Sequence, residues 1–209
     1  LPAKAIEHAK MILASTFSSA APGALIDSAR ILRDLAKDRG GKPEATVWFD
    51  GTRLPAASAA RVNAGLSDAA ASDDSDIRNT AHYGTTLASA GLAIAERTGA
   101  TGKDLLGAMV IGYEAAGRIG DARRGGRAGL HASQLVAFGG AVAVARLLKL
   151  TDQQMAHALG IVATTMGGIA IGTNSWAREY MGSNAAGSGV DAAEAAARGF
   201  TVNDDMLGA

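Results

Sequence analysis

The stretch SQLVAFGGAVAVARLLK, residues 133–149, is apolar around nearly its whole circumference when it is written as a helix. A surface helix carries one apolar stripe, whereas a helix that is apolar on all sides lies in the interior of a protein. Gly139 and Gly140 stand in its middle, and each glycine costs a helix interior roughly 1 kcal/mol relative to alanine. We therefore expect a central, buried helix whose glycine pair marks the close approach of a neighbouring backbone.

The rest of the chain also has the periodicity of helices. Pro2 suits the first turn of a helix that carries Ile6, Ala9 and Leu13 on one face. Further helices are expected at 24–36, 56–70, 85–98, 103–120, 152–165 and 184–198. Thr151 and Gln154 form a capping box, and Gly199 is a helix stop.

A single strand signal interrupts this helical pattern. Asp50-Gly51 within ATVWFDGTRLP, residues 45–55, supplies the tight turn of a small β-hairpin. The βαβ alternation of a doubly wound sheet is missing, which argues against a nucleotide-binding fold of that type. The sequence predicts a mainly α fold, a compact array of Ala- and Gly-rich helices with one hairpin, in one domain over residues 1–209.

Composition narrows the classes of function. Lys+Arg and Asp+Glu both number 20, so a dedicated nucleic-acid-binding domain, which carries a basic excess, is not expected. The 209 residues contain no cysteine and cannot form a disulfide or ligate an iron–sulfur cluster through thiolates. The longest apolar run, 135–145, falls short of the roughly 20 residues that span a bilayer. With no signal-peptide pattern, we expect a soluble, cytoplasmic protein without a membrane partner.

The four histidines divide into two groups. His8 and His157 lie within predicted helices and are interpreted as structural. His82 and His131 each stand where a loop meets a helix, among polar residues. Such junctions are where a rigid scaffold presents functional groups.

Asp73, Asp74 and Ser75 precede His82 and bring acceptors and a hydroxyl close to a titratable imidazole. Three interpretations stay open for this group. It forms a solvated helix N-cap, a Mg²⁺ or Mn²⁺ site, or part of a catalytic site. No HxxxH or ExxH spacing supports the metal, so we expect no metal here.

The segment RRGGRAGLHASQ, residues 123–134, places Arg123, Arg124 and Arg127 before His131. Guanidinium groups bind carboxylate and phosphate in a bidentate manner. A nucleic-acid-binding Arg-Gly segment would be longer and interleaved with aromatic residues. Small-anion binding is therefore favoured over nucleic acid, and an ordinary surface loop stays open. A third polar cluster, 173–200, places Arg178 at the mouth of a helix, which also suits an anionic ligand.

Taken together and in order, four segments of the chain resemble the MmgE/PrpD family, which includes 2-methylcitrate dehydratase, cis-aconitate decarboxylase and iminodisuccinate epimerase. The segments are ARVNAGLSDAAASDDSD (60–76), GATGKDLLGAMVIGYEAAGRIG (99–120), GLHASQLVAFGGAVAVARLLKLTDQQMAHALGI (129–161) and SWAREYMGSNAAGSGVDAAEAAARGFT (175–201).

The resemblance implies a helical domain that works against a second, lid domain beyond this chain. It also implies acid–base chemistry on a di- or tricarboxylate without metal or cofactor. Elimination of water, as in 2-methylcitrate dehydratase, is the first expectation. Decarboxylation or epimerisation on the same scaffold is the alternative, and a non-catalytic helical oligomerisation module is the third. Gly- and Ala-rich helices suit tight subunit packing, so a homodimer is expected.

The resemblance and the polar clusters together define an expected site. The expected catalytic residues are His82, His131, Asp74 and Ser75, and the expected substrate-binding residues are Arg178, Arg127 and Asn184.

The chain departs from the family pattern at several of these positions. Ala71 replaces an Asp, Tyr83 and Ala132 follow the two histidines where Pro is common, and Met181 stands in place of a frequent His. Arg178 replaces a Lys. Because Arg stays charged, it can hold a carboxylate but serves poorly as a base.

Overall fold

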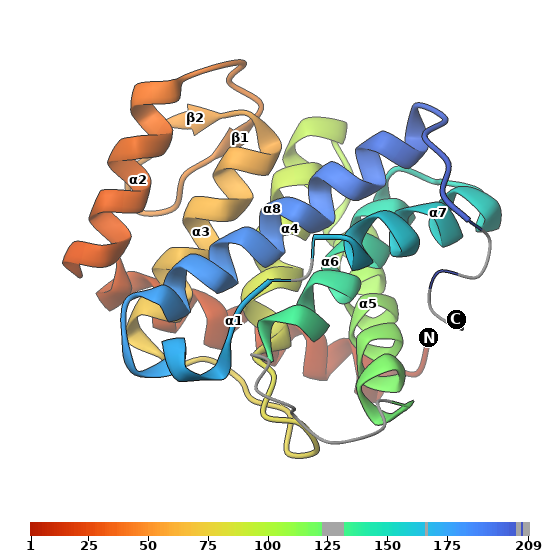
Figure 1. The fold of residues 1–209 in the computed structure, drawn as a ribbon, viewed down its shortest axis with the longest axis horizontal. Coiled ribbons are helices and arrows are strands. Elements are labelled where there is room, and N and C mark those ends of the chain that lie inside the picture. Colours follow the sequence, from red (N-terminus) through yellow and green to blue (C-terminus); the bar gives the residue numbers. More distant parts are fainter. Residues whose placement is uncertain (123–131, 166, 204–205, 207–209) are drawn as a thin grey trace.

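The computed structural model describes residues 1–122, 132–165, 167–203 and 206 of the chain. Over this part, the mainly α fold expected from the sequence is confirmed, and one small antiparallel sheet accompanies the helices (Figure 1). The α-helices are α1 (Ala3–Gly23), α2 (Asp27–Arg39), α3 (Ala56–Ala70), α4 (Tyr83–Thr98), α5 (Gly102–Ala122), α6 (Ser133–Leu147), α7 (Asp152–Ala163) and α8 (Ala177–Ala197), with a short 3-10 helix, η1 (Ala170–Asn174), before the last.

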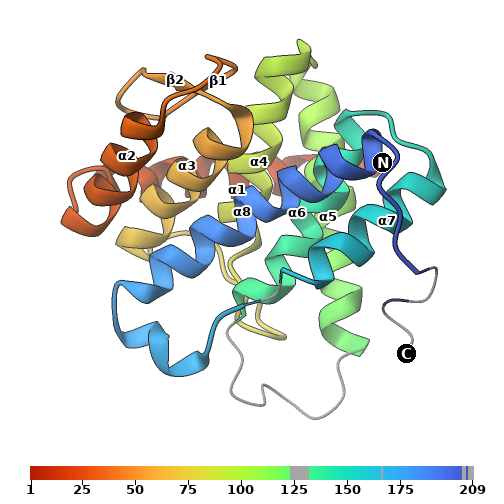
Figure 2. The same cartoon turned by 45° about the horizontal axis from the view of Figure 1, so that its top comes forward.

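Helix α6 lies at the centre of the fold, as its all-round apolarity predicted. Every residue of this helix except Arg146 is buried. It contacts α4, α5, α7 and α8, which surround it (Figures 1 and 2). The expected central helix is therefore confirmed.

The glycines of α6 lie where neighbouring helices approach most closely. A Cβ built on Gly112 of α5 would lie 2.6 Å from the carbonyl oxygen of Gly139. A Cβ built on Gly189 of α8 would lie 2.9 Å from the backbone nitrogen of Ala141 and 3.0 Å from the carbonyl carbon of Gly140. We call this set of backbone contacts the glycine crossing. It confirms the close approach that the Gly139-Gly140 pair predicted.

The hairpin predicted at 45–55 is also confirmed. Strands β1 (Ala45–Thr46) and β2 (Arg53–Leu54) pair antiparallel, and Gly51 in the turn has a positive φ of 79°. The Asn63 side chain ties this hairpin to α3. It accepts a hydrogen bond from the Trp48 N–H and donates one to the Thr46 carbonyl, both at 2.9 Å.

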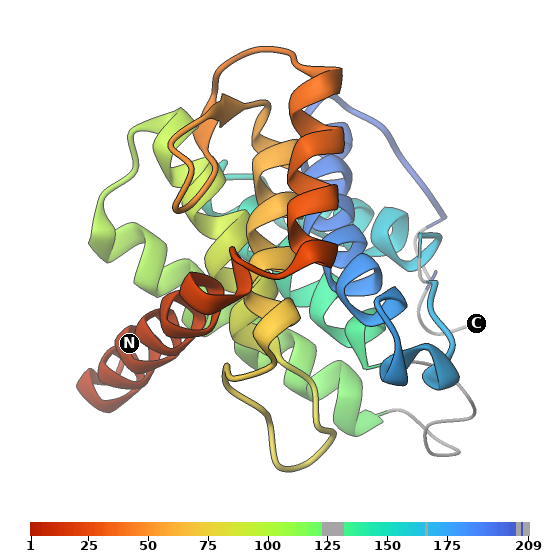
Figure 3. The same cartoon turned by 90° about the vertical axis from the view of Figure 1, so that its left-hand side faces the viewer.

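The largest boundary difference concerns α8, which begins at Ala177 and not near residue 184. Gly182, which precedes the expected start of the helix, lies inside α8. A Cβ there would lie 3.3 Å from the Asp68 carboxylate, so this glycine serves the close packing of α8 on α3. The two helices lie side by side (Figure 3).

Candidate active site

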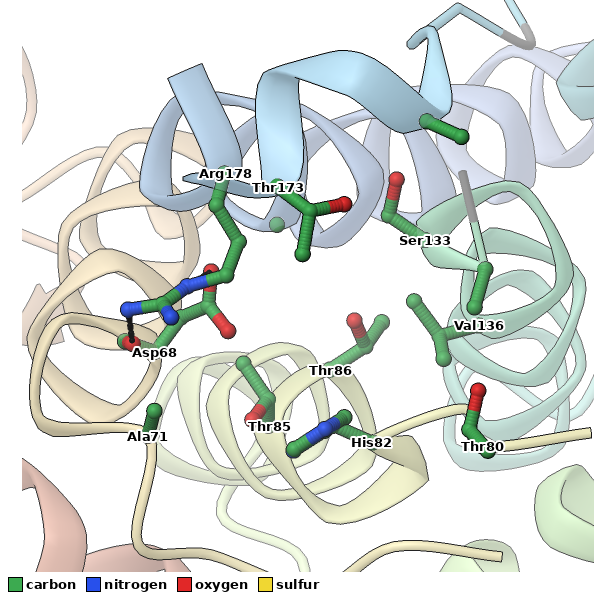
Figure 4. A pocket seen from close by; sticks show the side chains of 13 residues that line it. Asp68, Ala71, Thr80, His82, Thr85, Thr86, Ser133, Val136, Thr173 and Arg178 are labelled. Atoms are coloured by element: carbon green, nitrogen blue, oxygen red, sulfur yellow. Dashed lines mark hydrogen bonds and ion pairs between the residues drawn. The ribbon is translucent and has the colours of Figure 1, made fainter. Parts of the chain in front are cut away.

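A cavity of about 240 Å³ opens at the end of the bundle where α3 ends and α4, α6 and α8 begin (Figure 4). It is lined by Asp68, Ala71, Thr80, His82, Thr85, Thr86, Ala132, Ser133, Val136, Ala170, Thr173, Arg178 and Gly182. Residues from six separate segments thus share one small space. An enclosed cavity with a few convergent polar groups is the usual form of a small-molecule site.

His82 enters this cavity from the residue just before α4 and is held by a buried carboxylate. Its Nδ1 lies 3.0 Å from Asp73 Oδ1, and the Asp73 side chain is fully buried. Thr85 donates a hydrogen bond to the second carboxylate oxygen. The hydrogen bond to Asp73 raises the pKa of His82 above its usual value, although burial opposes the shift. Asp73 thus fixes the orientation of the imidazole. Among the described residues, Nε2 of His82 has no hydrogen-bond partner.

Asp68 and Arg178 form a second charged pair on an adjoining wall, across the cavity from Ser133 and Val136 (Figure 4). The Asp68 side chain reaches the cavity from α3, and its Oδ2 lies 3.6 Å from Arg178 Nε. Arg178 Nη2 donates to the backbone carbonyls of Asp68 at 2.8 Å and Ala69 at 3.4 Å. The guanidinium therefore binds the C-terminal end of α3, and Figure 4 shows the Asp68 carboxylate on its cavity side.

Burial governs the charge state of Asp68. Desolvation raises its pKa to about 6, although the nearby Arg178 charge lowers it. Glu179, which is also buried, lies 3.4 Å from Arg178 Nη2 and competes for the same guanidinium. The Arg178 guanidinium is therefore already paired with carboxylates of the protein itself.

This geometry can be set beside known proteins. The model of the MmgE/PrpD N-terminal domain matches the sequence over residues 1–208. The chain belongs to the MmgE/PrpD family. The family resemblance seen in the sequence is thereby confirmed for the N-terminal domain, and the family is dehydratase-like. A comparison with curated proteins gave no match.

Two of the expected catalytic residues of this MmgE/PrpD domain lie outside the cavity lining. Asp74 Oδ1 accepts a hydrogen bond from the Gly84 N–H at 2.9 Å, so Asp74 binds the first turn of α4. Ser75 is exposed. The carboxylate that holds His82 is Asp73, because the two adjacent side chains diverge from the same loop. The N-cap residue of α4 is His82 and not a member of the Asp-Asp-Ser-Asp run, although Asp74 accepts the Gly84 N–H, and Asp73 holds the imidazole.

Asn184 lies next to the cavity and not in it. Its exposed side chain lines a neighbouring pocket of about 200 Å³, which shares Ser133 with the first. His131 and Arg127, together with Arg123 and Arg124, fall outside the described residues, so their expected roles stay predictions. Ala132 and Ser133, which follow His131 in the chain, both line the cavity.

The two histidines interpreted as structural lie away from the cavity. His157 is buried in α7, and its Nδ1 accepts a hydrogen bond from the Val202 N–H at 3.4 Å. His8 is exposed on α1. Over the residues that the structure describes, no group of three or more metal-ligating side chains comes together. No described helix combines the length and apolarity needed to cross a membrane.

Sequence reasoning missed Asp68, Thr85 and Thr86. Asp68 stands within AGLSDAAAS, a run of small and apolar residues that ends α3. A lone carboxylate in such a run is a signal, since Asp is almost never fully buried without a partner. Its partner, Arg178, follows 110 residues later, so the pairing itself could not be seen in the sequence.

Proposed function

We propose that this MmgE/PrpD domain performs acid–base chemistry on a small di- or tricarboxylate, and that the reaction is the elimination of water, most like 2-methylcitrate dehydratase. The observation that carries the proposal is the His82–Asp73 pair at a small cavity that Arg178 and Asp68 also line. A buried carboxylate that fixes one imidazole nitrogen is a common arrangement around a proton-transfer histidine.

The chemistry requires two proton transfers. A base removes a proton from the carbon beside a carboxylate, and an acid gives a proton to the hydroxyl that leaves from the neighbouring carbon. The C–H electron pair becomes the new C=C bond, the C–O bond breaks, and water is released. Fixed positive charge near the carboxylate stabilises the negative charge that develops.

The described residues supply several of these functions. His82 is one proton-transfer group, and His131 is expected to be the second, without assignment of which is acid and which is base. Asp73 is a positioning residue that acts through His82. Arg178 contributes positive charge from behind Asp68, while Arg127 and Asn184 remain predicted carboxylate contacts. Asp74 binds the N-terminal turn of α4, and the exposed Ser75 is assigned no contact with the substrate in this proposal.

Decarboxylation and epimerisation share the same carbanion beside a carboxylate, so one assay separates the candidate reactions. Two samples are prepared, the 209-residue chain and the protein that its full reading frame encodes. Each is incubated with 2-methylcitrate, cis-aconitate and iminodisuccinate, and the products are followed by proton NMR. Loss of water from 2-methylcitrate supports the proposal. If only cis-aconitate or iminodisuccinate is turned over, the proposed elimination of water is wrong, but the assignment of an acid–base site stands.

We also propose that the chain forms a homodimer, because its Gly- and Ala-rich helices suit close packing between subunits. Light scattering on the same samples measures the mass. If the chain is a folded dimer and neither it nor the protein encoded by its full reading frame turns over any of the three compounds, the result would support a non-catalytic helical oligomerisation module.

A further inference from the structure

We infer that Asp76, Arg78 and Tyr113 are positioning residues, which hold His82 at the cavity through the loop that carries it, residues 76–82. None of the three is among the residues that line the cavity. Their effect on turnover rests on the proposed function, which assigns proton transfer to His82. Their effect on the placement of the imidazole does not.

Backbone hydrogen bonds close this loop around Asp76. The Asp76 N–H donates to the Ala81 carbonyl at 2.9 Å, and the Thr80 N–H donates to the Asp76 carbonyl at 2.7 Å. Within this turn Thr80 takes a positive φ of 57°, and it lines the cavity on the same side as His82 (Figure 4). The position of Asp76 therefore determines where the loop places both side chains.

The side chain of Asp76 ties the loop to α5. The residue is buried, and its Oδ1 accepts hydrogen bonds from the N–H and Nε of Arg78, at 2.8 and 3.1 Å. Its Oδ2 accepts from Arg78 Nη2 at 2.9 Å and from the hydroxyl of Tyr113, on α5, at 3.1 Å. The hydrogen bonds from Arg78 lower the pKa of Asp76 below its usual value. A buried, ionised carboxylate with charge-assisted hydrogen bonds is a strong junction between two segments.

The loop contacts α4 and α5 at further points. Asn79 Nδ2 donates to the hydroxyl of Tyr83, the first residue of α4, at 2.9 Å. On α5, a Cβ built on Gly117 would lie 2.6 Å from Arg78 Nη2, so the glycine leaves the space that the guanidinium occupies. Arg78 Nη1 also donates to Asp121, near the end of α5, at 2.7 Å. The loop is thus held against both helices.

Arg78 is engaged within this network and is not available as a substrate ligand. Its guanidinium pairs with Asp76 and Asp121 at 2.9 and 2.7 Å. The network therefore acts on the cavity through the loop and not through direct contact with a ligand.

The effect reaches the imidazole because Asp73 and His82 stand on either side of the loop. Asp73 precedes it and His82 ends it, so conformational freedom in the residues between them loosens the hydrogen bond at Nδ1. Catalytic groups must be placed accurately, since a misplacement of about 1 Å can cost on the order of a hundredfold in rate.

Solvent exchange of the His82 Nδ1–H tests the inference without any substrate, because the hydrogen bond to Asp73 protects this proton. The exchange rate is measured by NMR on the ¹⁵N-labelled 209-residue chain. Tyr113→Phe removes one hydroxyl and no charge, and Asp76→Asn keeps the shape and removes the charge. We expect both variants to exchange this proton about tenfold faster than the unmodified chain, with the helical circular dichroism retained.

Asp50→Asn is the matched control. It removes another ion-paired carboxylate, which lies in the hairpin turn, pairs with Lys37 at 3.1 Å and does not line the cavity. This variant should leave the exchange rate of the His82 proton unchanged. If Asp76→Asn fails to fold, Tyr113→Phe decides the question.

Turnover of 2-methylcitrate is measured in the protein that the full reading frame encodes. In Tyr113→Phe and Asp76→Asn, kcat should fall about tenfold and KM should change by less than about twofold, because neither residue lines the cavity.

The outcomes separate the two proposals. An unchanged exchange rate in the two variants, or equal acceleration by Asp50→Asn, overturns the positioning role. A raised KM with an unchanged kcat also overturns it, because that pattern belongs to substrate binding. If the unmodified protein turns over none of the candidate substrates while the two variants still accelerate exchange, the proposed function fails and the positioning of His82 stands.

Discussion

Helix α6 contains two regions, one helical turn apart, that have opposite character. At Ser133 and Val136 it lines the cavity, where Asp68 Oδ2 and Thr86 Oγ1 have no hydrogen-bond partner among the described residues. At Gly139 and Gly140 it meets α5 and α8 so closely that a methyl group added to Gly112 of α5 or to Gly189 of α8 would collide with the α6 backbone. The glycine crossing fixes the relative positions of α5, α6 and α8, and the N-terminal turns of α6 and α8 beyond it line the cavity.

The difference separates stability from function along the same helices. Close-packed backbones at the crossing gain dispersion energy and tolerate no added volume. Within the part of the chain that the structure describes, the cavity holds buried polar atoms without hydrogen-bond partners, and such atoms cost stability unless a ligand pairs with them. Substitutions at the crossing should therefore change the free energy of unfolding, and substitutions at the cavity should change binding and turnover.

The largest effect is expected for His82→Asn. The Asn amide can still donate to Asp73 in place of Nδ1–H, but no group replaces Nε2. Turnover of the carboxylate substrate should fall by about a thousandfold, the range of lost acid–base catalysis. The helical circular dichroism should be unchanged. His8→Asn on exposed α1 is the matched control, and equal activities of the two variants would remove His82 from the chemistry.

At the crossing, Gly112→Ala should lower the free energy of unfolding by about 2 kcal/mol, a typical cost of overpacking. The new Cβ would lie 2.6 Å from the Gly139 carbonyl oxygen. Gly102→Ala on the same helix meets nothing within 4 Å and should be neutral or slightly stabilising. Urea unfolding measures both, and a neutral Gly112→Ala would mean that the helices are not locked there.

Asp73→Asn should lower the pKa of His82, because the hydrogen bond to Asp73 is the main cause that raises it. The pair stabilises the fold fully below the ordinary histidine pKa of about 6.5, and this contribution is lost as the pH rises through the raised value. The stability difference between wild type and variant should therefore shrink from acid to alkaline pH. An NMR titration of the imidazole gives the pKa directly, and an unchanged value would refute the pairing.

The smallest effect is expected for Asp74→Asn. Burial, followed by the charge of Asp73, raises the pKa of Asp74 to about 6. For an acid with a raised pKa, stability is highest below the unfolded value and falls as the pH rises through about 6. The variant keeps an acceptor for the Gly84 N–H and should be more stable at neutral pH by about 1 kcal/mol.

Turnover distinguishes the two roles considered for Asp74. If Asp74 acts only by binding the first turn of α4, Asp74→Asn should keep near-normal activity, as should the control Asp38→Asn, which changes an exposed carboxylate of α2. A loss of a hundredfold or more would restore Asp74 to the catalytic group.

Local patterns predicted much of the fold. The central helix, the glycine approach and the hairpin follow from periodicity, composition and turn residues that lie within short stretches. The start of α8 could not be predicted, because Gly182 packs against Asp68, which is distant in the sequence.

The site was predictable only in part for the same reason. His82 was found at its loop-to-helix junction. The choice between Asp73 and Asp74 depends on how the loop 71–82 is folded, and its Thr80 takes a positive φ of 57° that no pattern announces. Asp68 was missed because it becomes a candidate site residue only through its ion pair with Arg178 and its position in the cavity wall.

The most direct test of a carboxylate site at this cavity uses His82, His8 and His157 as probes. The imidazole signals of the ¹⁵N-labelled chain are followed by NMR while 2-methylcitrate is added. The His82 signals should shift with saturation, and those of His8 and His157 should stay in place. Saturable shifts at His8 or His157 with an unmoved His82 would contradict the assignment of the site.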